Sequence, residues 1–167
     1  MKVCSIVLIC LGYVMAGCAV TGTSYDYDAG YDFSSISSYS WLDMPFNYSA
    51  DPLAVSRVKA AVDQQMKSKG YHLDPAAPNI LISLEGYKST VRREPESTRY
   101  SSLTGQRLAN EQFQEGMFIL TMIDAKTDRL VWEGHAKGLG GPYRSTESRA
   151  KKTEEVVTKL LAKFPPK

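Results

Sequence analysis

Two segments in which apolar residues alternate with polar or small ones flank a short polar stretch in the second half of the chain. The segments are GMFILTMID (116–124) and LVWEGHAKG (130–138), and DAKTDR lies between them. Such alternation is typical of β-strands with one buried face, and a polar turn of this length joins antiparallel neighbours. The pattern predicts a β-hairpin. It therefore commits the chain to a sheet with an apolar face that other elements must cover.

Two amphipathic helices are predicted to provide this cover. The first begins at Asp51, a suitable N-cap that is followed by proline, and it ends at Gly70, a suitable C-terminal cap. Apolar residues between them recur every three or four positions. The second helix is expected over residues 145–163, where a similar apolar stripe is stopped by two prolines.

Strands over residues 31–42 and 79–87 complete the set, which gives the order β-α-β-β-β-α. We expect an α+β fold, a two-layer sandwich in which a mixed four-stranded sheet carries both helices on one face. Residues 31–167 are predicted to form a single domain, because a chain of 167 residues with 43% hydrophobic content supports one core. Residues 88–114 are polar without a sustained period, and we expect a long loop there.

The N-terminus has the pattern of an export signal. The apolar run VCSIVLICLGYV (3–14) follows Lys2 and is shorter than the roughly 20 residues of a membrane-spanning helix. The segment VMAGC resembles the lipobox of bacterial lipoproteins, although Met15 stands where leucine is usual. We expect residues 1–17 to be a removed signal peptide, Cys18 to be diacylated, and residues 18–30 to be a flexible tether. The alternative is an ordinary secretory signal whose cysteine is incidental.

The cysteine count favours the lipoprotein interpretation. Cys4, Cys10 and Cys18 form an odd set that suits no disulfide framework. Cleavage before Cys18 would remove two thiols, and acylation would consume the third. Acylation with palmitate and a diacylglyceryl group also supplies the several chains that stable anchoring requires. The predicted location is the cell envelope, facing the periplasm. Ala19 follows the cysteine, and the absence of aspartate at this position resembles the outer-membrane sorting pattern of enteric bacteria. The membrane that we expect is therefore the outer membrane.

No constellation for catalysis or metal binding stands out. His72 and His135 lie in different predicted elements without neighbouring ligands, so a zinc site is unsupported. The chain has no G-x-S-x-G elbow, and its glycine-rich segment lacks the lysine of a P-loop. The pair Asp124 and Asp128 frames the predicted turn, where aspartate is favoured for structural reasons. We expect no catalytic residues, no cofactor and no metal, and we do not expect an enzyme.

Binding residues are sought among aromatic and basic side chains. Tyrosines gather with Trp41 near the mature N-terminus, where amphipathic rings could bind glycan or peptide or could simply pack. Residues 18–87 carry an acidic excess and residues 88–167 a basic one, which suits an acidic partner or an ordinary solvated surface. The net charge of +2 is too small to indicate nucleic-acid binding. The candidate binding residues are Tyr39, Trp41, Arg92, Arg93 and Arg99.

Several segments together resemble one known family. They are the D-F-S-x(4)-Y-S-W pattern from Asp32 to Trp41, the Asp-Ala-Lys-Thr turn at 124–127 with Leu-Val-Trp at 130–132, and the closing Phe164-Pro165-Pro166. In this order they resemble the bacterial lipoprotein family called domain of unknown function 4136. The resemblance implies a small envelope lipoprotein domain in bacteria with two membranes, and it implies no reaction and no catalytic residues. The chain departs from it mainly over residues 88–114.

The predicted function is a lipid-anchored periplasmic domain that binds or scaffolds another envelope component. Its partners would be the membrane, through acyl groups on Cys18, and an envelope protein or glycan. Two alternatives stay open. One is a hydrolase of envelope polymers that uses a carboxylate pair, such as Asp124 with Asp128 or Glu94 with Glu96. The other is a binder of small ligands or glycans that uses the N-terminal aromatic cluster.

Overall fold

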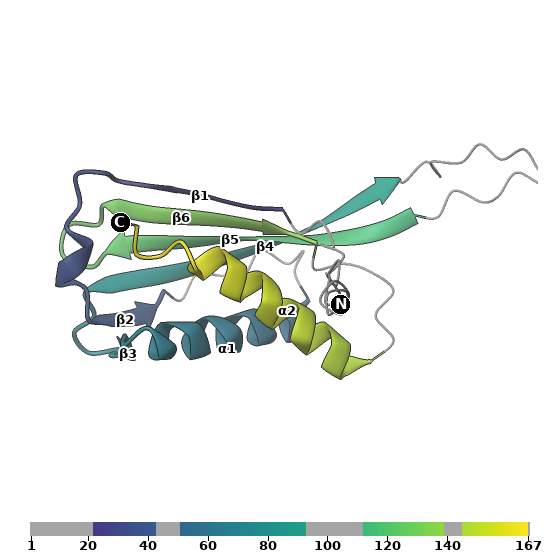
Figure 1. Cartoon of the computed structure of the whole chain (residues 1–167), viewed down its shortest axis with the longest axis horizontal. Helices are drawn as coiled ribbons and strands as arrows, with labels where there is room; N and C mark the ends of the chain where they lie inside the picture. Colours follow the sequence, from purple (N-terminus) through teal and green to yellow (C-terminus); the bar gives the residue numbers. More distant parts are fainter. Residues whose placement is uncertain (1–21, 43–50, 93–111, 139–144, 167) are drawn as a thin grey trace, which may run out of the picture.

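A computed structural model describes residues 22–42, 51–92, 112–138 and 145–166. Figure 1 shows the elements in these ranges. They are β1 (Thr23–Tyr27), the short 3-10 helix η1 (Phe33–Ser35), β2 (Ser38–Trp41), α1 (Pro52–Ser68), β3 (His72–Leu73), β4 (Ile80–Arg92), β5 (Gln112–Asp124), β6 (Leu130–Lys137) and α2 (Thr146–Leu161).

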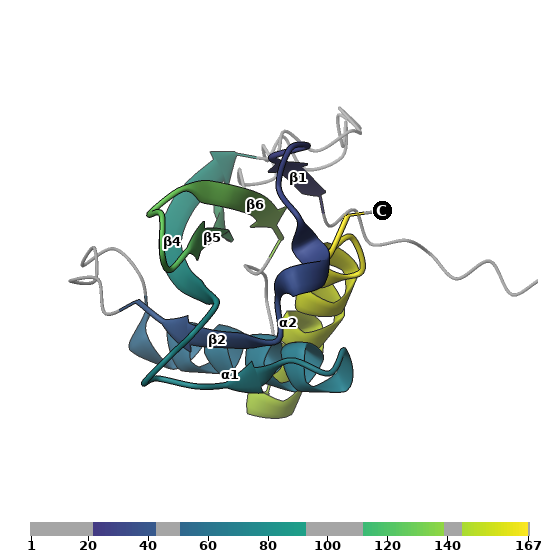
Figure 2. The ribbon, with the colours of Figure 1, turned by 90° about the vertical axis from the view of Figure 1, so that its left-hand side faces the viewer.

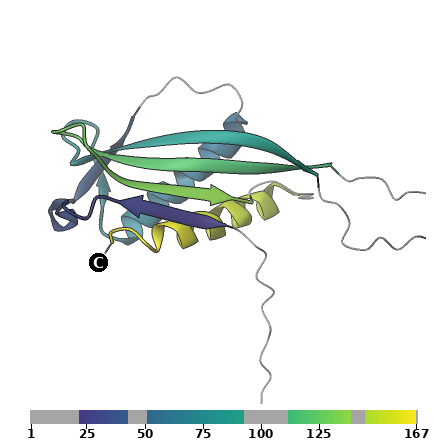
Figure 3. The same ribbon diagram turned by 90° about the horizontal axis from the view of Figure 1, so that it is seen from above.

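The strands form one mixed sheet in the order β1-β6-β5-β4-β2-β3. β2 runs parallel to both β3 and β4, and the other neighbours are antiparallel. The sheet is strongly curved (Figure 2), and both helices pack on the same face of it (Figure 3). The predicted α+β class, with a mixed sheet and two helices on one face, is confirmed. The described part of the chain has six strands, however, and the sequence predicted four.

One of the additional strands lies in the segment that was predicted to be a flexible tether. Thr23–Tyr27 form β1, which pairs with β6 in the register Thr23↔Ala136 to Tyr27↔Trp132. The sequence TSYDY has little apolar character, so its pairing depends on a partner edge that only the folded sheet supplies. The tether prediction is therefore wrong for these residues. Residues 18–21 lie outside the described ranges.

The predicted strand over residues 31–42 is divided into two elements. Asp32 caps η1 because its side-chain Oδ1 accepts a hydrogen bond from the Ser34 backbone N–H at 3.0 Å. The chain is extended again from Ser38, where β2 begins. β3, the other additional strand, has only two residues and pairs with Ser38 and Tyr39. The extra strands are thus short edge elements around the predicted core of the sheet.

The hairpin of β4 and β5 is longer than the sequence indicated. The two strands pair without interruption from Ile80↔Asp124 to Arg92↔Gln112. Residues 88–92 and 112–114, which were predicted as loop, therefore belong to strands, and residues 93–111 lie outside the described part of the chain. Figure 1 shows this two-stranded ribbon projecting beyond β6 and both helices.

α1 begins and ends where its predicted caps indicate, and α2 lies within the predicted range 145–163 and ends at Leu161. The Asp51 side chain accepts from the Leu53 N–H at 3.0 Å, and Ser145 forms a capping box with Ser148. Gly70, just beyond α1, adopts a φ of +92°, a backbone conformation that residues other than glycine rarely adopt. None of the described helices has the length and apolar character needed to cross a bilayer.

The core lies between the sheet and the helices. Strands β4, β5 and β6 contribute alternate residues, and each helix contributes one stripe. The largest fully buried side chains of the core are Trp132, Phe164, Met66, Ile80, Ile82, Leu120, Met122, Leu160 and Leu161. Phe164 follows α2 and places the end of the chain against the sheet. This placement creates a pocket at one end of the sheet.

Candidate functional site

The end of the chain is held by an aromatic cluster centred on Phe164. Its ring lies 6.0 Å from that of Phe33, 5.7 Å from that of Tyr71 and 5.6 Å from that of Trp132, measured between centroids. The contacts with Phe33 and Trp132 are edge-to-face, an arrangement that aromatic quadrupoles favour. The cluster joins η1, the segment after α1, strand β6 and the chain terminus at one end of the sheet.

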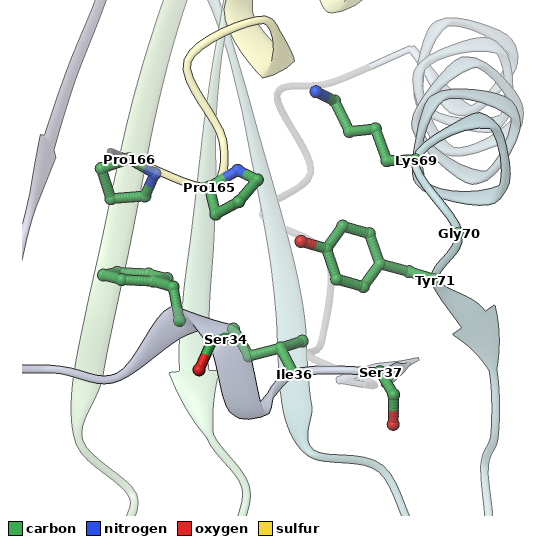
Figure 4. Close-up of a pocket in the computed structure, with 9 residues that line it drawn as sticks. Ser34, Ile36, Ser37, Lys69, Gly70, Tyr71, Pro165 and Pro166 are labelled. Carbon is green, nitrogen blue, oxygen red and sulfur yellow. The ribbon is translucent and has the colours of Figure 1, made fainter.

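A pocket of about 390 Å³ opens beside this cluster (Figure 4). Three segments distant in the sequence line it: the η1 region, the end of α1 with the residues after it, and the C-terminal prolines. The lining residues are Phe33, Ser34, Ile36, Ser37, Lys69, Gly70, Tyr71, Pro165 and Pro166. A pocket of this size with mixed polar and apolar walls can hold a small ligand.

Two hydrogen-bond donors lie on one wall of the pocket. In Figure 4 the side chains of Lys69 and Tyr71 both extend from the end of α1 toward the side of the pocket where the C-terminal prolines lie, and the Lys69 ammonium ends above Pro165 in this view. Among the described residues, the structure gives the Lys69 ammonium no ion pair and the Tyr71 hydroxyl no hydrogen-bond partner. Burial raises the pKa of Tyr71, so its hydroxyl keeps its proton at neutral pH. The wall therefore offers one cation and one neutral donor.

The opposite wall is fixed by hydrogen bonds from the chain around η1. Asn79 Oδ1 accepts from the backbone N–H groups of Ser37 and Ser38, at 2.9 and 3.0 Å. The Ser34 hydroxyl donates to Asp32 at 2.6 Å, which lowers the pKa of that carboxyl. Because these contacts tie the η1 region to the start of β4, this side of the pocket is held in place before any ligand binds.

Tyr39 and Trp41, two predicted binding residues, contact α1. The Tyr39 hydroxyl and the Trp41 indole N–H both donate to Asp63 Oδ1 on α1, at 2.8 and 2.9 Å. Tyr39 is only 2% exposed, and burial, with the hydrogen bond to Asp63 as a lesser cause, raises its pKa. The Lys59 ammonium lies 4.9 Å from the centroid of the Trp41 ring. These side chains join β2 to α1 and do not line the pocket.

The remaining predicted site residues lie at the end of β4 or outside the described ranges. Arg92 is the last residue of β4, at the tip of the projecting ribbon. Arg93, Arg99 and the predicted lipidation site Cys18 lie outside the described ranges. Of the N-terminal tyrosines, Tyr25 and Tyr27 are partly exposed and stack on β1, with ring centroids 6.3 Å apart.

The carboxylate of Asp124 serves the hairpin turn. Its Oδ1 accepts from the Lys126 and Thr127 N–H groups, and its Oδ2 accepts from the Tyr31 hydroxyl at 2.8 Å. The hydroxyl hydrogen bonds from Tyr31 and Thr127 lower the Asp124 pKa to about 2. Burial, together with the bond to Asp124, raises the Tyr31 pKa to about 12. Asp128, the other member of this predicted carboxylate pair, adopts a φ of +53° in the same turn.

The histidines are separated as the sequence indicates. His72 lies on the edge strand β3, and His135 Nε2 lies 2.7 Å from Glu133 Oε1 on β6. Within the described ranges, no three His, Cys, Asp or Glu side chains gather in a way that could hold a metal ion.

Sequence reasoning missed the pocket because its walls come from three separate segments. The two donors lie in SKGY, whose glycine indicates only the end of a helix, and the two prolines indicate only that the second helix stops. The available signal was composition, since Lys69, Tyr71 and Phe33 are residue types common in binding sites. Their convergence requires the aromatic cluster of Phe164, which is a tertiary feature.

Comparison with known proteins identifies relatives of the whole domain. The family model described as "Domain of unknown function (DUF4136)" matches residues 23–166. A solved DUF4136 family protein from Bacteroides thetaiotaomicron is 17% identical, with a TM-score of 0.55; the match covers 87% of this chain and 96% of that one. No curated protein sequence matches the chain.

Two further solved structures share the fold. The PelC dodecamer from Paraburkholderia phytofirmans is 13% identical with a TM-score of 0.53, and the match covers 85% of this chain and 95% of that one. A PDZ domain protein from Parabacteroides distasonis is 15% identical with a TM-score of 0.57. That match covers 87% of this chain but 35% of the other, so this chain spans only part of that protein's length. At these identities the similarity shows the fold alone.

Proposed function

The chain belongs to the DUF4136 family, and we propose that it is a lipid-anchored domain of the bacterial cell envelope that binds or scaffolds another envelope component. The observation that carries this proposal is the short distance in sequence between Cys18 and the first strand. The lipobox-like VMAGC ends at Cys18, and β1 begins at Thr23.

Covalent geometry limits how far the folded domain can lie from an anchored Cys18. The backbone N–H of Lys137 donates to the Gly22 carbonyl at 2.9 Å, so the chain is tied to the sheet from Gly22 onward. An extended chain covers at most about 3.6 Å per residue, which is roughly 14 Å between Cys18 and Gly22. An acylated Cys18 would therefore hold the domain close to the bilayer.

Binding is favoured over catalysis by the engagement of the candidate acids. Asp124, a member of the predicted carboxylate pair Asp124 and Asp128, accepts hydrogen bonds from its own turn and from Tyr31. The most effective general acids and bases have a pKa near the operating pH, whereas the hydrogen bonds to Asp124 lower its pKa to about 2. Among the described lining residues of the pocket, Lys69 is the charged one, and a carboxylate pair is not part of that lining.

The proposal is tested by crosslinking in intact cells, followed by purification from membranes. The wild-type chain is compared with Cys18→Ser, which keeps the domain but removes the acylation site. We expect a specific envelope partner to copurify with the wild-type protein and to be much reduced with the variant. Equal recovery of the partner with both proteins would contradict a role that depends on lipid anchoring. The absence of any specific partner would contradict scaffolding.

A further inference from the structure

We infer that the pocket between η1, the end of α1 and the C-terminal prolines binds a small carboxylate with an apolar body. This inference rests on the proposed function, because it names the ligand chemistry of a domain that is proposed to bind. The ligand could be a free organic acid or the carboxyl end of a peptide, since both present the same group.

The donors on one wall select the charged group. The Lys69 ammonium and the Tyr71 hydroxyl lie on the same side of the pocket, one above and one below the level of Pro165 in the view of Figure 4. An ammonium and a neutral hydroxyl can both donate to one carboxylate, whose two oxygens only accept. Hydrogen bonds that involve an ionised partner are shorter and stronger than neutral ones. A cationic ligand group would instead be repelled by Lys69.

The other lining residues select the apolar body. Phe33, Ile36, Pro165 and Pro166 present hydrocarbon surface to the pocket, and Tyr71 adds the face of its ring. Ile36 belongs to the hydrophobic core and Phe33 packs against it, so buried neighbours fix the positions of both side chains. A ligand that carried only charge would leave this surface exposed to water, whereas an aliphatic or aromatic group would cover it.

The position of the pocket suits a ligand that arrives from the aqueous side. β1 runs from Thr23, opposite Ala136, to Tyr27, opposite Trp132. Trp132 contacts Phe164, which directly precedes Pro165 and Pro166 in the lining of the pocket. The pocket thus lies at the Trp132 end of the sheet, whereas the link to Cys18 joins at the Ala136 end. The four residue steps from Thr23 to Tyr27 separate these ends by about 14 Å.

Isothermal titration calorimetry on the protein extracted from membranes tests the inference. The probes are 3-phenylpropanoate, a free acid, and N-acetyl-alanyl-phenylalanine, a peptide carboxyl end. The amide 3-phenylpropanamide is the uncharged control. Lys69→Met removes the ammonium, and Tyr71→Phe removes the hydroxyl. Lys67→Met is the matched control, because this exposed lysine lies two residues away and does not line the pocket.

We expect at least one acid to bind saturably and about tenfold more tightly than the amide, because charged hydrogen bonds are worth more than 1 kcal/mol each. Lys69→Met should weaken that binding by about tenfold, and Lys67→Met should leave it unchanged. The acid that binds more tightly identifies the source of the ligand.

Equal binding of acid and amide, equal effects of the two lysine variants, or no saturable binding of either acid would overturn the inference. Cys18→Ser should bind the acid like the wild type, so failure of the lipid anchor can be distinguished from failure of the pocket.

Discussion

Trp132 lies across Gly134, its neighbour on the same face of β6. A Cβ atom at position 134 would stand 2.3 Å from Cη2 of the Trp132 ring and 2.9 Å from Cδ1 of Leu160. Real Cβ contacts are essentially never shorter than 3.0 Å. Glycine at position 134 therefore leaves room for the Trp132 ring between β6 and Leu160 of α2.

Gly134→Ala is expected to destabilise the domain by about 1–3 kcal/mol, because the added methyl group overpacks a core that has no room to relax. The measurement is the free energy of unfolding in urea. Gly22→Ala is the matched control, because a Cβ at position 22 meets nothing within 4 Å. If the two variants unfold at the same urea concentration, the described packing of Trp132 is wrong.

Asp63→Ala is expected to cost about 1–3 kcal/mol of unfolding free energy, because it leaves the Tyr39 hydroxyl and the Trp41 indole N–H without their acceptor. Asp63→Asn keeps an acceptor oxygen and should cost less. Gln64→Ala, on the exposed side of α1, should change the unfolding free energy by less than about 0.5 kcal/mol. A loss in Asp63→Ala no larger than in Gln64→Ala would show that this contact does not join β2 to α1.

The stability of the domain is expected to fall as the pH drops from 4 to 2. Asp124 has a pKa of about 2 when folded and an ordinary value of 3.8, so folding favours its charged form. Its contribution is complete above pH 3.8 and is lost as the pH passes through 2. We expect about 1 kcal/mol, because solvent screens this partly exposed group. Asp124→Asn should flatten this part of the pH profile of urea unfolding, and an unchanged slope would contradict the assigned hydrogen bonds.

Phe164→Ala is expected to destabilise the domain by about 3–5 kcal/mol, because it removes a ring that is 1% exposed from the centre of the aromatic cluster. Phe164→Leu should lose less, since it keeps most of the buried volume. Lys163→Ala, at an exposed neighbouring position, serves as the control for urea unfolding. A chain that tolerated Phe164→Ala as well as Lys163→Ala would show that the C-terminal residues do not close the core.

The strongest sequence periodicities predicted the central part of the fold. The hairpin of β5 and β6 and both helices formed where apolar spacing and caps indicated, because these signals are local. β1 was missed since five largely polar residues form a strand only against the edge of β6. The extension of the β4–β5 ribbon was also missed, because its pairing depends on a neighbouring strand and not on its own pattern.

The site was less predictable than the fold. Tyr39 and Trp41 are amphipathic rings on a strand, and sequence alone could not distinguish a binding surface from the contact with Asp63 that the structure shows. Lys69 and Tyr71 carried no motif. Their relation to Pro165 depends on the return of the chain after α2, which is fixed by the packing of Phe164. Convergence of distant segments has no local sequence signature.

The central claim is that the domain is anchored by lipid at Cys18, and intact-mass spectrometry of the protein extracted from membranes tests it most directly. The account predicts a chain that begins at Cys18 and carries the added mass of a diacylglyceryl group and acyl chains. Cys18→Ser should lack this mass and leave the membrane fraction. A membrane-bound chain that retains residues 1–17, or one with an unmodified Cys18, would contradict the claim.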